Sequence, residues 1–225
     1  MKSIAVILEV GSKKTVASAA DWPGWCRVGR DGETALQLLA DSAPRYGQVL
    51  ARGGIKFQPP KDSSALTVTA RVTGNATTDF GAPAIILDSD REPVTTSEWK
   101  LWTAILESGW LSFDDAVQRA DGRELRKGPR GGGRELDEIL NHVLEADWEY
   151  LKRIAWTRKP ERGRDARESI HNLRRDILSA LEAARNSGLP AQGPRGGVIW
   201  PPRYFIRRTA WHVLDHVWEI EDRIL

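Results

Sequence analysis

The chain changes character at about residue 90, and this change limits its fold more than any other feature of the sequence. Before it, short segments with the composition of β-strands dominate, and after it the apolar residues recur at helical spacing. Residues 88–94, which contain Pro93, mark the change. A chain of 225 residues also exceeds an ordinary domain of about 100 to 150 residues. We therefore predict two domains, an α+β module over residues 1–90 and an all-α domain over residues 91–225.

The first part combines predicted strands with one predicted helix. The apolar run at residues 4–10 and the segment at residues 15–20 are typical of strands, and a third strand is expected around the Pro-Gly turn in DWPGWCRVG. Alternation of apolar and polar residues over residues 65–73 predicts another, and residues 84–87 form a further short candidate. Helical spacing of apolar residues predicts one helix over residues 31–50, with Asp31 as its cap.

The second part is predicted to contain four long helices. Their expected spans are residues 97–118, 134–156, 165–188 and 203–225. Thr95 and Glu98 have the spacing of a capping box for the first, and two consecutive prolines precede the last. Apolar residues three and four apart give each helix one face for a shared core. The expected fold class is thus an α+β module followed by an all-α four-helix bundle.

Composition excludes several classes of function. The net charge is only +2, with ten basic and nine acidic residues up to position 90, and 23 basic and 22 acidic residues after it. Neither part has the positive surplus of a nucleic-acid-binding or membrane-surface protein. No stretch reaches the roughly 18 apolar residues of a membrane span. The single cysteine, Cys26, permits no internal disulfide, so the expected location is the cytoplasm.

All four histidines lie in the helical part, and three of them form a candidate metal site. His212 and His216 are four residues apart in WHVLDH, so a helix places both rings on one face. His142 borders the apolar stripe of the second long helix, so it points toward the bundle interior. Three histidine ligands with one open position are the pattern of catalytic zinc. The alternative is that these are ordinary hydrogen-bonded histidines, and His171 is expected on the surface.

The helical part resembles the DinB-like superfamily of metal-binding four-helix bundles. The segments ELDEILNHVLEADWEYL and TAWHVLDHVWEIEDR carry the resemblance, which covers residues 95–225. It implies that His142, His212 and His216 bind a divalent transition metal, zinc or nickel above all. It also implies a low-molecular-weight thiol as cofactor and an S-transferase or isomerase activity on a small electrophile. Arg208 lies one turn before His212, so it is a candidate anchor for the thiol or substrate, or else a solvated arginine.

The first part has a weaker resemblance to HicB-like modules. The turn DWPGWCRVG and the segment GETALQLLADSA carry it. Such modules bind or dimerise and have no catalytic residues of their own, so the resemblance implies an accessory role and allows a homodimer. The competing function is therefore a non-catalytic protein that binds a ligand or partner and has a structural or vestigial histidine site.

Overall fold

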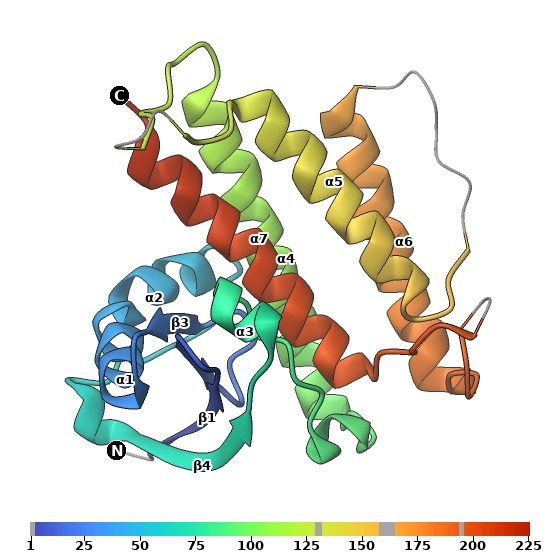
Figure 1. Ribbon diagram of the computed structural model, residues 1–225. Helices are drawn as coiled ribbons and strands as arrows, with labels where there is room; N and C mark the ends of the chain where they lie inside the picture. The colour runs from blue at the N-terminus through green and yellow to red at the C-terminus, as the bar shows by residue number, and fades with distance from the viewer. Residues whose placement is uncertain (1–2, 129–131, 158–164, 194–195) are drawn as a thin grey trace.

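The computed structural model describes residues 3–128, 132–157, 165–193 and 196–225, and it is a mixed α+β structure (Figure 1). A four-stranded sheet with short helices comes first, and four long helices follow. The sheet has the order β3-β2-β1-β4. β1 is antiparallel to β2 and parallel to β4, and β2 is antiparallel to β3. The strands are β1 (Ile4–Val10), β2 (Thr15–Ala19), β3 (Cys26–Gly29) and β4 (Leu66–Thr73).

The single helix predicted over residues 31–50 is wrong, because the structure has two helices there, α1 (Gly32–Asp41) and α2 (Ala43–Arg52). Asp31 caps α1 as predicted. Pro44 lies in the first turn of α2 and has no N–H to extend the hydrogen-bond ladder of α1. The break therefore follows from one residue that the apolar spacing does not reveal.

The strand predicted at residues 84–87 is also wrong, because this segment is irregular. Its first two backbone N–H groups, those of Ala84 and Ile85, donate to the buried carboxylate of Glu9 on β1, at 2.8 and 3.3 Å. A side chain thus satisfies donors that a strand would give to its neighbour. The remaining short helices are α3 (Ala76–Phe80) and the 3-10 helices η1 (Ser63–Ala65) and η2 (Asp88–Arg91).

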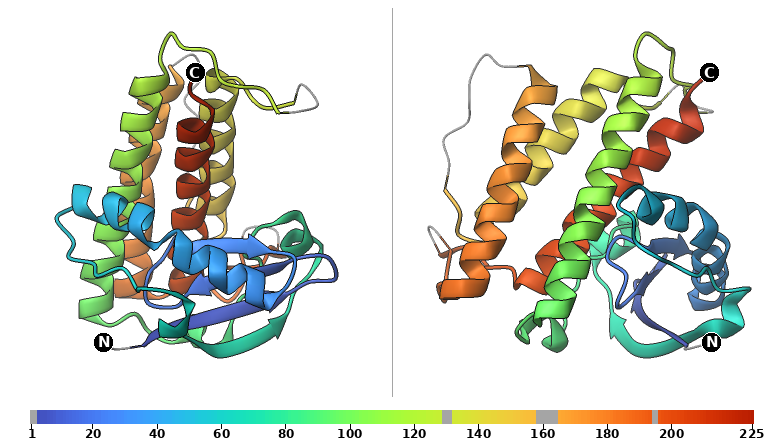
Figure 2. Two further views of the ribbon diagram at one scale, coloured as in Figure 1. Left: turned by 90° about the vertical axis from the view of Figure 1, so that its left-hand side faces the viewer. Right: turned by 180° about the vertical axis from the view of Figure 1, so that it is seen from behind.

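The four long helices are confirmed close to their predicted spans. α4 packs along α7, and α5 packs against both α6 and α7 (Figures 1 and 2). Gly109 lies at the contact of α4 with α7, where an added Cβ would come within 3.1 Å of Val213 Cγ1. No helix in the described part of the chain is long and apolar enough to cross a membrane. The bounds are α4 (Thr96–Ala120), α5 (Leu136–Lys152), α6 (Ala166–Ser187) and α7 (Pro202–Arg223).

One continuous apolar core crosses the predicted boundary at residue 90. It joins Trp25 and Tyr46 of the first part to Ile105 of α4, and α2 packs against α4. At the boundary itself, the buried carboxylate of Asp90 accepts two hydrogen bonds from the guanidinium of Arg207 on α7, at 3.1 and 2.5 Å. Packing as well as chain connectivity thus joins the two parts, and their division into domains stays a prediction.

Candidate metal centre

Three histidine side chains meet between α5 and α7. His142 lies in the second turn of α5, and His212 and His216 lie one turn apart on α7. The i, i+4 spacing places the latter two on one face of α7, as predicted. Both are buried, while His142 is half-buried. The packing of α5 on α7 thus brings together residues that are 70 positions apart in the chain.

The ring nitrogens of this cluster have the spacing of metal ligands. His212 Nε2 lies 3.3 Å from His142 Nε2 and 3.2 Å from His216 Nε2. All three ligand atoms lie within 4.8 Å of one another. Two nitrogens bound to one zinc at about 2.0 to 2.1 Å with a tetrahedral angle are about 3.3 to 3.4 Å apart. The three histidines are therefore close enough to hold one metal ion.

Hydrogen bonding alone satisfies this arrangement poorly. His216 Nδ1 faces Glu219 Oε2 at 2.8 Å, so Nδ1 carries the proton and the Nε2 of a neutral His216 has a lone pair. His212 Nε2 then has two nitrogen neighbours but can offer only one proton or one lone pair. At least one of the two short N···N contacts lacks a good hydrogen bond. A cation at the point where the rings converge would use the lone pairs of all three.

Comparison with known proteins adds no relative. No protein-family model, curated protein or solved structure matches this chain. The resemblances to DinB-like and HicB-like proteins therefore stay proposals that rest on residues and geometry.

Glu219 orients the histidine cluster, and the sequence reasoning missed it. Its Oε2 accepts the hydrogen bond from His216 Nδ1, and its Oε1 accepts a hydrogen bond of 2.9 Å from Arg223 Nη1. A carboxylate behind a ligating histidine fixes the ring and its tautomer. The two glutamates one turn either side of His142 on α5 do not contact the cluster: Glu138 accepts from the backbone N–H of residue 135 at the start of the helix, and Glu145 is exposed. The useful signal was the i, i+3 spacing from His216.

Burial keeps two of the histidines in the neutral form that binds metals. It lowers the pKa of His142, with the positive charge of Arg134 as a further cause. It lowers the pKa of His212 well below the usual value, and the nearby His216 and His142 lower it further. The hydrogen bond with His216 lowers the pKa of Glu219, so this carboxylate stays ionised. Neutral imidazoles backed by a carboxylate are ready to bind a cation without first losing protons.

Arg208 lies beside the histidine cluster, but two of its nitrogens are already engaged. Its Nη1 donates to the carbonyl of Pro83 at 2.6 Å, and its Nε donates to the hydroxyl of Tyr150 at 3.3 Å. The guanidinium also lies 4.6 Å from the ring centroid of Trp211. Tyr150 in turn has its ring 5.6 Å from that of His212, so it belongs to the site. The sequence analysis did not single out Tyr150, although it lies two turns from His142 on the same face of α5.

The other candidate residues lie outside the cluster. His171 is exposed on α6, as expected. Cys26 is buried in β3, where burial raises the pKa of its thiol to about 12, so the thiol stays protonated and unreactive. Within the described residues, the side chains that lie close enough together to hold a metal ion are those of His142, His212 and His216.

Proposed function

We propose that His142, His212 and His216 bind one divalent transition-metal ion, zinc or nickel in particular, and that the ion serves a reaction. The observation that carries the proposal is the convergence of three Nε2 atoms with spacings of 3.2 and 3.3 Å. No cysteine or carboxylate of the described residues joins this group as a fourth ligand. Structural zinc sites are usually closed by four protein ligands, whereas catalytic sites keep one position open.

The proposed reaction class is the transfer or isomerisation of a small electrophile with the help of a low-molecular-weight thiol. The order of the residues supports it, because the second of four long helices carries one histidine and the last carries an HxxxH pair, as in a DinB-like bundle. A bound divalent ion lowers the pKa of a thiol that reaches it. Arg208 would then hold an anionic group of the thiol through Nη2, while its bonds to Tyr150 and Pro83 fix its position.

One observation favours the competing function, a non-catalytic binding protein. The two hydrogen bonds and the aromatic neighbour of Arg208 also describe an arginine that joins the first part of the chain to α7. In this case the histidine cluster would be structural or vestigial. Metal binding alone does not separate the two functions, but access of a thiol to the metal does.

The first experiment measures metal binding. We expect one zinc or nickel ion per chain in a titration against a chelating indicator. His212→Ala removes a residue that would bind the metal directly. Its metal affinity should therefore fall by more than the roughly 10- to 100-fold loss that follows when only the hydrogen-bond partner of a metal-binding residue is removed. His171→Ala is the matched control and should bind like the wild type. Absence of binding at micromolar metal, with the helical circular dichroism intact, would refute the proposed site.

The second experiment tests the open position. Glutathione, bacillithiol or mycothiol added to the cobalt-substituted protein should produce a sulfur-to-metal charge-transfer band. Arg208→Ala should weaken the thiol affinity by about 10- to 100-fold, as expected for a charge-assisted hydrogen bond, and leave cobalt bound. A spectrum that none of the three thiols changes would favour the binding protein.

A further inference from the structure

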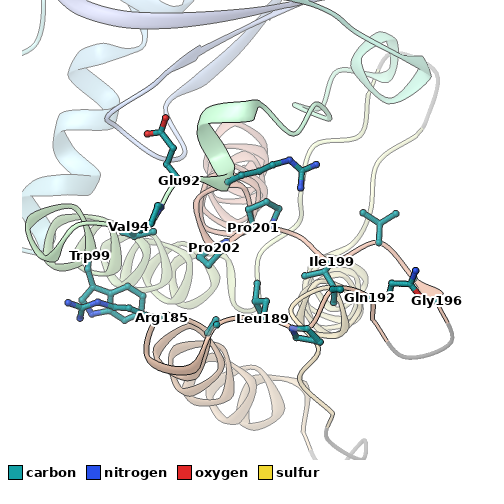
Figure 3. Close-up of a pocket in the computed structure, with 18 residues that line it drawn as sticks. Glu92, Val94, Trp99, Arg185, Leu189, Gln192, Gly196, Ile199, Pro201 and Pro202 are labelled. Atoms are coloured by element: carbon teal, nitrogen blue, oxygen red, sulfur yellow. The ribbon is translucent and has the colours of Figure 1, made fainter.

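A cavity of about 720 Å³ lies at the end of the helical part where α4 and α7 begin and α6 ends. Figure 3 shows the residues that line it. None of them belongs to the histidine cluster. We propose that this cavity binds a small amphipathic anion, a molecule with a flat or branched apolar body and one carboxylate or sulfonate group. The proposal does not depend on metal binding.

Apolar side chains provide most of the wall. Val94, Leu189, Ile199 and Pro202 lie around the cavity, and the ring of Trp99 closes one side (Figure 3). A volume of 720 Å³ lies within the range of about 300 to 1,000 Å³ for small-molecule sites. An apolar body of two or three rings would gain free energy by leaving water for such walls.

The wall is held in place before any ligand arrives. Arg203, in the first turn of α7, donates to the carbonyl groups of Glu92 and Pro93 at 3.0 and 2.8 Å. The same guanidinium forms an ion pair with Glu98 on α4, at 2.7 Å. The hydrogen bond from Arg203 lowers the pKa of Glu98 to about 2, so the pair persists at neutral pH. A preformed wall reduces the ordering cost of binding.

The positive charge of an arginine in the cavity wall indicates that the ligand carries an anionic group. Arg185 lies with its guanidinium 5.3 Å from the ring centroid of Trp99, and its Nη2 donates to Thr96 Oγ1 at 3.0 Å. Within the described residues, neither Arg185 nor Arg91 of the cavity wall forms an ion pair. The carboxylate of Glu92 points away from the other labelled side chains (Figure 3). A positioned arginine that lacks an acidic partner, beside an apolar cavity, matches an anion with an apolar body.

The experiment uses the full chain and two probes of similar shape. 1-Anilinonaphthalene-8-sulfonate carries the anionic group, and N-phenyl-1-naphthylamine lacks it. We expect one sulfonate probe to bind per chain in calorimetry. Arg185→Gln should weaken its binding by about tenfold or more, and change the affinity of the uncharged probe by less than about twofold. Arg30→Gln, at an exposed arginine of the first part, is the control and should change neither.

Two further variants locate the bound probe. Leu189→Trp should weaken binding of both probes, because the larger ring takes up part of the cavity. His212→Ala should bind both probes like the wild type, since it alters only the histidine cluster. The proposal is overturned if the sulfonate probe does not bind, if Arg185→Gln binds both probes like the wild type, or if Leu189→Trp binds both as tightly as the wild type.

Discussion

Replacing Glu219 by glutamine tests whether the carboxylate behind His216 supports metal binding. The amide keeps the size of the side chain and one acceptor oxygen but removes the negative charge that holds the Nδ1 proton. The contact is 2.8 Å long, and the carboxylate side chain is 24% exposed. A hydrogen bond to a charged group contributes about 1.5 to 3 kcal/mol, and partial exposure places this one near the lower value. We therefore expect a 10- to 30-fold loss of metal affinity.

The assay is a competition titration of zinc between the protein and a chelating indicator at pH 7.5. Glu145→Gln is the matched control, because Glu145 is exposed on α5 one turn from His142. It removes the same charge near the site without touching His216. An affinity for Glu219→Gln within twofold of the wild type would refute the argued role, and so would an equal loss in the control.

Two further predictions concern stability. Asp90→Ala leaves buried Arg207 without its acidic partner, so the free energy of unfolding should fall by about 3 to 5 kcal/mol. Asp115→Ala is the control: it removes partly exposed ion pairs with Arg52 and Arg119, each of which should contribute less than about 1 kcal/mol in urea titrations. Equal losses in the two variants would contradict this. Burial raises the pKa of Asp147 to about 7, against about 3.9 in an unfolded chain, so between these values the folded state holds a proton that the unfolded state lacks. The contribution of Asp147 to the free energy of unfolding should then fall as pH rises from about 4 to about 7. Asp147→Asn should remove this contribution and so change the slope of the unfolding free energy against pH in urea titrations; an unchanged slope would contradict the prediction.

The sequence alone determined the features that depend on local spacing. The capping pair of Thr95 and Glu98 and the three-and-four apolar spacing located the long helices, because a helix repeats every 3.6 residues whatever surrounds it. The pairing of His212 with His216 followed for the same reason. The two errors in the first part arose where one group outweighs the pattern, namely a missing N–H at Pro44 and a buried carboxylate at Glu9.

Only the tertiary structure decided which helix faces meet. His142 approaches His212 because α5 packs on α7, and a repeat within one helix carries no information about its neighbour. Arg208 was found next to its histidine by spacing, but its bond to the carbonyl of residue 83 joins atoms 125 positions apart. Such contacts depend on how separate segments bury their apolar faces together, and this is a property of the whole chain.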